Sequence, residues 1–228
     1  MKFSLNNGLT LIAPTPPGSG AITGGILKIM NEFNIVEEQT VMHRFIEAMK
    51  FAYAQRFKLG DWKFVPKVKD TIKYIQSDQW LEFVRSRLND HSTSNSIEYY
   101  GANVTLLKDD AGTSAITVLS ENGDAVSATA TLNLYFGSGI MSPSTHITLN
   151  NNMNDFSIPN VPDHYGIKPS PENYIEPQKN PLSSMSPIII IDEKKNVKVV
   201  IGASGGPMII SGVAYVSGQV ITNFNTSL

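Results

Sequence analysis

The sequence contains no cysteine, so disulfide bonds, thiolate metal sites and a cysteine nucleophile are excluded. It also lacks an excess of charge of either sign, because 18 Lys and Arg are balanced by 20 Asp and Glu within 228 residues. This balance argues against nucleic acid as a partner, since nucleic-acid-binding domains carry a basic patch. Long apolar runs are missing as well. The run at 188–191 is as short as a strand and ends at Asp192, so we expect no membrane segment.

Histidines are few, and none is placed for metal binding. His43, His91, His146 and His164 are scattered without an i, i+4 pair, and no HExxH motif is present, so we expect no metal site. The glycine-rich stretch at 18–20 is too short for a dinucleotide fingerprint and follows two prolines instead of a strand. We therefore expect no cofactor and interpret 18–20 as a tight turn that opens a helix.

The first half of the chain has a helical pattern. Apolar side chains recur at every fourth position from 41 to 57, which predicts one long amphipathic helix with Thr40 as its N-cap and Gly60 as a left-handed C-cap. A second helix is predicted over 77–88, with Asn89 as its stop. The apolar stripe of the first helix consists of Val41, Phe45, Met49, Tyr53 and Phe57.

The second half has the pattern of β-structure. Alternating residues within 116–135, with a turn signal at 121–124, predict a β-hairpin. The stretch at 142–184 is rich in Pro, Asn and Ser, which predicts a long irregular surface connection of the kind that often carries function. A second hairpin over 187–203 and an apolar helix after residue 206 follow.

The sequence GASGG at 202–206 matches the nucleophile elbow G-x-S-x-G. A serine hydrolase built on Ser204 would need an acid and a histidine after it, but residues 205–228 contain neither. The same backbone suits another use, because Gly205 and Gly206 at a helix start would direct bare N–H groups at a developing negative charge. Taken alone, the motif is also compatible with a structural turn.

Six blocks of sequence, in the same order, match one known family. They are EAMKFAYA at 47–54 with LGD at 59–61, DAGT at 110–113, TLNLYFGS at 131–138, NNMNDF at 151–156, PLSSMSP at 181–187 and GASGG at 202–206. Together they resemble the gamma-glutamyltranspeptidases, also called glutathione hydrolases, of the N-terminal nucleophile hydrolase superfamily. The resemblance covers only the middle of the family pattern.

This resemblance implies an α/β (α+β) fold, the αββα four-layer sandwich of the N-terminal nucleophile hydrolases, incomplete in this chain. Residues 1–112 would be the C-terminal part of a large subunit and mainly helical. Residues 113–228 would be the N-terminal part of a small subunit and β-rich. The two subunits would form a heterodimer derived from one precursor.

The resemblance also implies the reaction. The precursor would cut itself between Gly112 and Thr113, and Thr113 would then act as nucleophile with its own freed amino group as base. An α-amino group has a pKa near about 8 and lies within reach of the hydroxyl of the same residue, which makes this arrangement chemically sound. A threonine acyl-enzyme would carry the γ-glutamyl group of glutathione or its conjugates to water or to an acceptor amino acid or peptide.

Roles transfer to the residues that match the family motifs. Thr131 matches the threonine that positions the nucleophile's hydroxyl, and Gly205 with Gly206 matches the oxyanion hole. Histidine, which family members carry two residues after the nucleophile, is replaced by Ala115, so we expect altered local support of Thr113.

Five further residues match the substrate-binding groups. Asn133 and Asp155 match groups that hold the substrate α-amino end, and Ser183 with Ser184 matches the pair that hydrogen-bonds the α-carboxylate. Asn152 stands where the family carries a glutamate that pairs with the substrate ammonium. Because charge-assisted hydrogen bonds contribute about 1.5 to 3 kcal/mol, we expect substrate binding to be weaker by about ten- to a hundredfold. The arginine that clamps the carboxylate in the family lies upstream of the matched region, and no residue visibly replaces it.

Two alternatives to an active transpeptidase stay open. One is a truncated or degenerate family member without catalytic activity, and the other is the serine hydrolase built on Ser204. Family members of the animal type lie on the extracellular face of the plasma membrane, and this location is implied here by resemblance. The glycosylation sequons at 103–105 and 225–227 are compatible with it.

Overall fold

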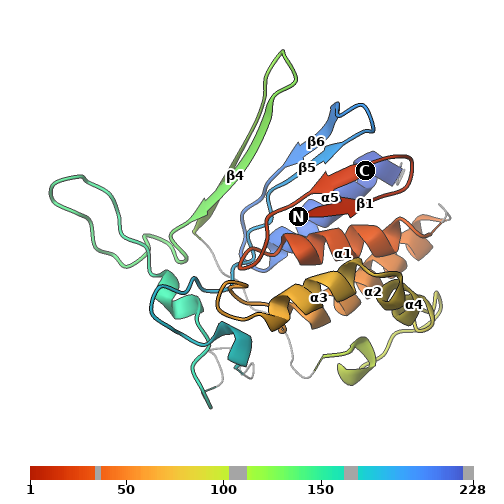
Figure 1. Ribbon diagram of the computed structural model, residues 1–228, viewed down its shortest axis with the longest axis horizontal. Helices are drawn as coiled ribbons and strands as arrows, with labels where there is room; N and C mark the ends of the chain where they lie inside the picture. The colour runs from red at the N-terminus through yellow and green to blue at the C-terminus, as the bar shows by residue number, and fades with distance from the viewer. Residues whose placement is uncertain (34–36, 103–111, 162–168, 223–228) are drawn as a thin grey trace.

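The computed structural model of the chain describes residues 1–33, 37–102, 112–161 and 169–222 (Figure 1). The helices are α1 (Gly20–Met30), α2 (Glu38–Arg56), α3 (Lys67–Gln76), α4 (Asp78–Arg85) and α5 (Met208–Thr222). The strands are β1 (Lys2–Ser4), β2 (Thr10–Ile12), β3 (Thr113–Leu119), β4 (Ala125–Thr131), β5 (Ile188–Ile191) and β6 (Val197–Ile201). Three short 3-10 helices are η1 (Glu98–Tyr100), η2 (Asn152–Asp155) and η3 (Pro171–Asn173).

A four-stranded antiparallel sheet in the order β1-β2-β5-β6 joins the two ends of the sequence. Its central pairing places Leu11 of β2 opposite Ile190 of β5. Both side chains are fully buried, as is Ile188, because every second residue of a strand faces the core. The sheet is therefore built from both parts of the chain and cannot form from either part alone.

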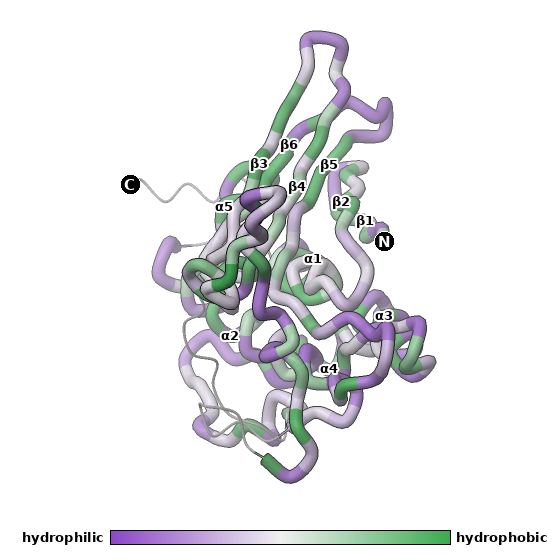
Figure 2. Tube along the Cα trace, turned by 90° about the vertical axis from the view of Figure 1, so that its left-hand side faces the viewer, coloured by the Kyte–Doolittle hydropathy of each residue, from purple (hydrophilic) through white to green (hydrophobic). Residues whose placement is uncertain are grey.

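The molecule has three layers in the order helix, sheet, hairpin. Helices α1 and α5 pack on each other and on the four-stranded sheet, and α2, α3 and α4 pack against α1 (Figure 1). The hairpin β3–β4 lies on β5 and β6 (Figure 2). These layers match the α, β and β layers of the expected sandwich, and no helix covers the outer face of the hairpin within the described residues. The largest fully buried side chains include Trp80, Phe51, Leu11, Ile22, Ile26 and Leu59.

Small residues bring the hairpin close to β6. A Cβ added at Gly202 would lie 3.2 Å from the Cβ atom of Ala115 and 3.3 Å from Oγ1 of Thr129. The hydroxyl of Ser127 donates to the carbonyl of Ile201 over 2.8 Å. Ser127 and Thr129 lie on the less exposed face of β4, since the burial of this strand alternates. This close contact fixes the hairpin over the end of β6.

The helix at 41–57 is confirmed within α2, but both predicted caps are wrong. The helix begins at Glu38, two residues before Thr40, and its N-cap residue Glu37 makes no side-chain capping hydrogen bond. It ends at Arg56, followed by Phe57 in a right-handed conformation. Gly60 does not have a positive φ; instead, a Cβ there would lie 2.2 Å from the carbonyl oxygen of Glu172. The glycine is needed for the close approach of η3.

The other observed helices agree in part with those predicted from the sequence. The helix at 77–88 is observed as α4, whose N-cap Ser77 accepts a hydrogen bond from the amide of Trp80 over 3.2 Å. It stops at Arg85, so Asn89 is not its terminus. The turn at 18–20 opens α1 as predicted, whereas α3, β1 and β2 were not predicted because each is short or weakly patterned.

Both hairpins and the apolar C-terminal helix are confirmed as β3–β4, β5–β6 and α5. Strand β4 stops at Thr131 instead of reaching 135, because Asn133 has a φ of +74° and turns the chain out of the sheet. Within its described residues, the connection at 142–184 contains only η2 and η3 and isolated bridges.

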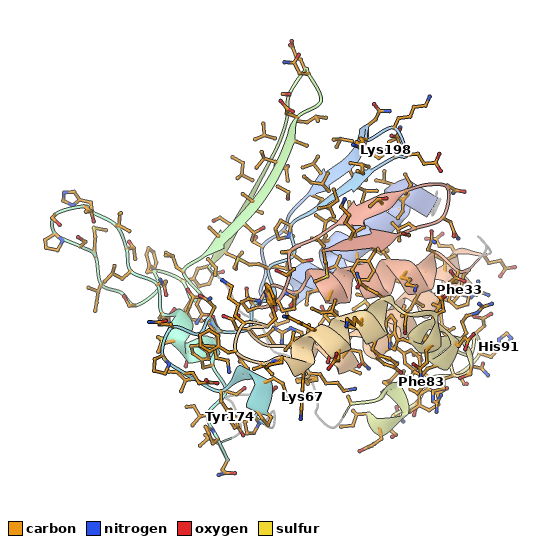
Figure 3. All side chains as sticks on the ribbon, viewed as in Figure 1. Phe33, Lys67, Phe83, His91, Tyr174 and Lys198 are labelled. Atoms are coloured by element: carbon orange, nitrogen blue, oxygen red, sulfur yellow. The ribbon has the colours of Figure 1, made fainter. Side chains whose placement is uncertain are left out.

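Some predicted features lie outside the described residues, namely the two sequons at 103–105 and 225–227, His164, and the first two residues of the block at 110–113. No described helix has the length and hydropathy needed to cross a membrane. Figure 3 shows His91 at the helical side of the molecule, away from the hairpin. In the described part of the chain, no group of three or more His, Asp or Glu side chains is suited to hold a metal ion.

The close approach at Gly60 generates a test of the fold. Replacement Gly60→Ala should destabilise the protein by about 1 to 3 kcal/mol, because the methyl group meets backbone that must move. The matched control is Gly212→Ala in α5, where a Cβ meets nothing within 4 Å. This change should raise the free energy of unfolding by about 0.5 to 1 kcal/mol, because alanine has a higher helix propensity than glycine. Urea unfolding measures both, and equal stability of the two variants would contradict the assignment.

Candidate active site

Thr113 and Thr131 lie directly opposite each other at the open end of the β3–β4 hairpin. The hydroxyl of Thr113 donates to Oγ1 of Thr131 over 3.2 Å. Thr131 in turn donates to the carbonyl oxygen of Gly112 over 3.3 Å and accepts from the amide of Asn133 over 2.9 Å. This hydrogen bond sets the orientation of the Thr113 hydroxyl, and the role of Thr131 in positioning a nucleophile stays a prediction.

The carbonyl group of Gly112, directly before Thr113, accepts two hydrogen bonds, and the Gly112 backbone has a positive φ. The carbonyl oxygen of Gly112 accepts hydrogen bonds from the amide of Leu132, over 3.1 Å, and from the hydroxyl of Thr131. Gly112 has a φ of +124°, and a Cβ there would lie 2.5 Å from the carbonyl oxygen of Leu134. Only glycine fits this position without strain. Two donors thus polarise the carbonyl at the predicted cleavage point.

Gly205 and Gly206 form a turn before α5, with φ values of +119° and +53°. Their carbonyl oxygens accept hydrogen bonds from the amides of Met208 and Ile209, over 3.1 Å each, which begins the helix. Among the residues that the structure describes, no acceptor takes the amide hydrogens of Gly205 and Gly206. The turn therefore leaves two N–H groups without an acceptor at a helix N-terminus, as the predicted oxyanion hole requires.

Two contacts fix where this turn lies. The phenol of Tyr53 in α2 donates to the carbonyl oxygen of Pro207 over 2.6 Å. On the other side, Gly202 rests against Ala115 and Thr129 of the hairpin. The turns of both hairpins point the same way in Figure 1, so the start of β3 and the end of β6 share the opposite end of the layers. Burial raises the pKa of Tyr53, so its phenol stays a donor at neutral pH.

The loop after the hairpin holds the residues predicted to bind the substrate amino group. Asn133 is buried, and its side-chain amide donates to the carbonyl oxygen of Asn151 over 3.3 Å. The amide of Leu134 donates to Oδ1 of Asn151 over 3.2 Å. Asn152 donates from Nδ2 to Oδ2 of Asp155 over 2.9 Å. The side-chain amide of Asn152 therefore orients the carboxylate of Asp155.

Asn173 connects this loop to the loop of the two serines. Its Nδ2 donates to the carbonyl oxygen of Asp155 over 2.7 Å, and its Oδ1 accepts from the amide of Leu182 over 2.8 Å. The side chain is buried. One amide group therefore sets the separation between Asp155 and Ser183, which were predicted to bind the two charged ends of one substrate. No sequence signal identified this residue.

The serine loop is held on both sides. The amide of Ser183 donates to the carbonyl oxygen of Pro17 over 2.8 Å, and its hydroxyl accepts from the amide of Met185 over 3.2 Å. The hydroxyl of Ser184 accepts a hydrogen bond from Nη2 of Arg56 over 2.9 Å. Sequence reasoning did not identify Arg56, which contacts Ser184 from the end of α2. It follows the block at 47–54 by two residues and lies on the same helix.

Asp61 ties the start of this loop to the end of α2. Its carboxylate accepts from the backbone and side-chain amides of Asn180, over 3.1 Å each, and from the amide of Lys63 over 3.1 Å. Burial by itself would raise the pKa of Asp61, but the hydrogen bonds from Asn180 and Lys63 outweigh it, so that the pKa is lowered. The ionised form is therefore the one that the fold uses.

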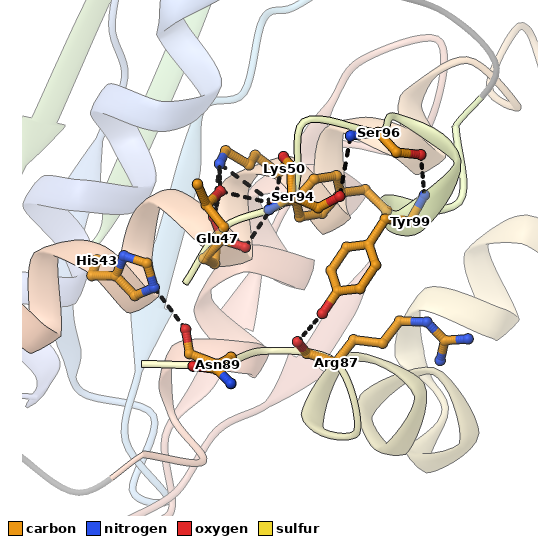
Figure 4. Close-up of polar contacts among 10 residues, drawn as sticks. His43, Glu47, Lys50, Arg87, Asn89, Ser94, Ser96 and Tyr99 are labelled. Atoms are coloured by element: carbon orange, nitrogen blue, oxygen red, sulfur yellow. Dashed lines mark hydrogen bonds and ion pairs between the residues drawn. The ribbon is translucent and has the colours of Figure 1, made fainter. Parts of the chain in front are cut away.

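A second buried carboxylate fixes the segment before the hairpin (Figure 4). Glu47 of α2 accepts hydrogen bonds from Lys50 and Thr93, over 2.7 Å each, and from the phenol of Tyr100 over 2.8 Å. Burial opposes ionisation of Glu47, yet these three donors lower its pKa. This network explains the matched block at 47–54 as structure, since it anchors residues 93–100 to α2.

The predicted site residues lie along one path of hydrogen bonds that are connected by short stretches of backbone. It runs from Thr113 through the loop of Asp155 to Asn173, then to the serine loop and Arg56, and along α2 to Tyr53 and the glycine turn. Every predicted residue lies on this path or within two residues of it. The nine are Thr113, Thr131, Asn133, Asn152, Asp155, Ser183, Ser184, Gly205 and Gly206.

The bridge at Asn173 leads to a second test. Replacement Asn173→Ala should lower the free energy of unfolding by about 1 to 3 kcal/mol, because the buried amide of Leu182 and the carbonyl of Asp155 lose their partner. Asn154→Ala is the matched control, since this exposed asparagine makes no side-chain hydrogen bond within the described residues. Urea unfolding of both variants measures the difference, and equal losses would contradict the bridging role.

The lowered pKa of Asp61 generates a test by pH. Its contribution to stability is fully present above the ordinary value of 3.8 and is lost as the pH falls through the lower value of the folded state. Wild type should therefore exceed Asp61→Asn in unfolding free energy at neutral pH, and this advantage should shrink below pH 3.8. Asp78→Asn, at a side chain 92% exposed, should show no such trend. A difference independent of pH would contradict the assignment.

Comparison with known proteins supports the resemblance read from the sequence. The gamma-glutamyltranspeptidase family model matches residues 1–226. Scoloptoxin SSD14 of Scolopendra dehaani is 40% identical over 225 residues, which cover 95% of this chain and 38% of that protein. Glutathione hydrolase 2 of Arabidopsis thaliana is 41% identical over 215 residues, which cover 92% of this chain and 37% of that protein. The chain thus spans well under half of the length of these relatives.

A solved structure confirms the fold class. The cephalosporin acylase from Bacillus halodurans superimposes on 98% of this chain, and on 38% of its own, with a TM-score of 0.75 at 19% sequence identity. This likeness concerns the fold alone, the mixed helix and sheet arrangement described above. With a family match over residues 1–226 and relatives 40% and 41% identical, the chain belongs to the gamma-glutamyltranspeptidase family.

Proposed function

We propose that this protein transfers or hydrolyses the γ-glutamyl group of glutathione and related compounds, after cutting its own chain between Gly112 and Thr113. The observation that carries the proposal is the contact of the Thr113 hydroxyl with Thr131, 3.2 Å away, beside a carbonyl that receives two hydrogen bonds. Family membership supports the substrate class.

The first step is the cleavage of the chain. Oγ1 of Thr113 attacks the carbonyl carbon of Gly112, and the resulting negative charge is stabilised by the amide of Leu132 and the hydroxyl of Thr131. The C–N bond breaks as the amine takes a proton, which leaves an ester between Gly112 and the threonine oxygen. Water hydrolyses this ester and frees the amino group and the hydroxyl of Thr113.

The second reaction uses the freed amino group as base. Its pKa near about 8 allows it to take the hydroxyl proton as the oxygen attacks the γ-carbonyl of the substrate. The N–H groups of Gly205 and Gly206 are the donors for the developing oxyanion. The leaving amine takes the proton, and water or an acceptor amino acid or peptide then releases the γ-glutamyl group from the acyl-enzyme.

The two loops joined by Asn173 bind the amino-acid end of the substrate. In this proposal the ammonium group lies against Asp155, oriented by Asn152, and against Asn133. The α-carboxylate accepts from the hydroxyls of Ser183 and Ser184. The short path between these loops supports recognition of an α-amino acid, whose two charges are separated by a single carbon.

The proposal includes a division into two subunits that stay together. Residues 1–112 would form part of the large subunit, mainly helical, and residues 113–228 part of the small one. The antiparallel pairing of β2 with β5 supports a lasting association after cleavage, as does the hydrogen bond from Ser183 to Pro17. Location on the extracellular face of the plasma membrane is also proposed, and the sequons at 103–105 and 225–227 are the support for it.

Incubation of the purified protein tests the proposal. Intact-mass analysis and denaturing gels should show two fragments produced by cleavage of the bond between Gly112 and Thr113. Thr113→Ala should abolish these fragments because no nucleophile remains. The matched control Ser204→Ala should be cut at the rate of wild type and should hydrolyse L-γ-glutamyl p-nitroanilide.

A protein that stays uncut and inactive would contradict the proposal and favour the inactive family member. Activity that survives Thr113→Ala but disappears in Ser204→Ala would contradict it in favour of the serine hydrolase.

A further inference from the structure

Arg56 is a cation in direct contact with the serine loop. It lies at the C-terminal end of α2, and its Nη2 atom donates to Oγ of Ser184 over 2.9 Å. Ser184 is buried, so the contact is shielded from bulk water and is electrostatically stronger than an exposed one. A positive charge therefore stands behind the hydroxyl that faces the proposed carboxylate subsite.

The hydroxyl groups of Ser183 and Ser184 both act as hydrogen-bond acceptors within the protein. The hydroxyl of Ser184 accepts from Arg56, and the hydroxyl of Ser183 accepts from the amide of Met185. Neither hydroxyl donates to an acceptor within the described residues. Because a hydroxyl that accepts still has one O–H to give, both serines are left as donors. A carboxylate, which only accepts, is the chemical group that two such donors and a nearby cation suit.

Helix α2 holds this subsite at a set place relative to the glycine turn. Tyr53 and Arg56 are three residues apart and so lie on one side of the helix. Tyr53 donates to the carbonyl oxygen of Pro207, next to Gly206, while Arg56 donates to Ser184. The charge of Arg56 also acts on Tyr53, where it opposes the effect of burial on the phenol. One turn of helix thus spans both the proposed oxyanion hole and the carboxylate subsite.

We propose that Arg56 is a positioning and specificity-determining residue that selects donors with an α-carboxylate. It orients the Ser184 hydroxyl as a donor and adds the positive charge that the two serines lack. The inference rests on the proposed function for the identity of the donor, but the contact with Ser184 is independent of the cleavage of the chain.

The test compares two substrates that differ by one group. L-γ-Glutamyl p-nitroanilide carries the α-carboxylate, and γ-aminobutyryl p-nitroanilide is the same molecule without it. Arg56→Gln should raise KM for the first by about 10- to 100-fold with kcat within about twofold, which corresponds to the loss of one charge-assisted interaction. It should leave kcat/KM for the second unchanged. Arg56→Lys, which keeps the charge, should recover most of the discrimination.

The matched control is Arg44→Gln, which removes another arginine from α2, one that pairs with Asp90 at 2.7 Å. This variant should keep the discrimination of wild type. Equal losses for both substrates in Arg56→Gln, or equal losses in both arginine variants, would overturn the proposal and leave Arg56 a structural role.

Failure of the proposed function would be seen separately, as a wild-type protein that hydrolyses neither anilide. Calorimetric binding then tests Arg56 without turnover. Wild type should prefer free L-glutamate to γ-aminobutyrate, and Arg56→Gln should lose that preference. A wild type that binds both compounds equally would overturn the inference.

Discussion

The site depends on the register of the β3–β4 hairpin, which sets Thr113 opposite Thr131. Because side chains alternate across a strand, a shift by one residue would turn the two hydroxyls to opposite faces. The close contact of Gly202 with Ala115 and Thr129 holds this register against β6. The positive φ of Asn133 then ends β4 directly after Thr131 and directs the chain into the loop that holds Asp155.

Helix α2 unites groups that are far apart in the sequence. Its buried Glu47 fixes residues 93–100, and one turn near its end contacts both the glycine turn and the serine loop. Asp61, just past the helix, holds the same loop at Asn180. A single rigid element from the first part of the chain thereby positions the binding loops of the second part, consistent with a sheet shared by both parts.

Much of the fold could be predicted because its signals are local. The repeat of four at 41–57, the turn at 121–124 and the isoleucine run at 188–191 each produced the expected element. Short elements such as β1 and β2 escaped prediction, since they depend on pairing with the distant strand β5. The caps at Thr40 and Gly60 were wrong because contacts, such as that of Gly60 with η3, decided those residues.

Some features of the candidate site could likewise be predicted from the sequence, and others depended on tertiary contacts. The sequence by itself determined the candidate residues, namely a threonine after a glycine, a pair of serines and a glycine turn, because short motifs record local backbone needs and side-chain type. Only the tertiary structure decided that Asn173 bridges the two binding loops and that Arg56 contacts Ser184. Such contacts join residues distant along the chain, and no local pattern records them, since their partners are fixed by the packing of helices on the sheet.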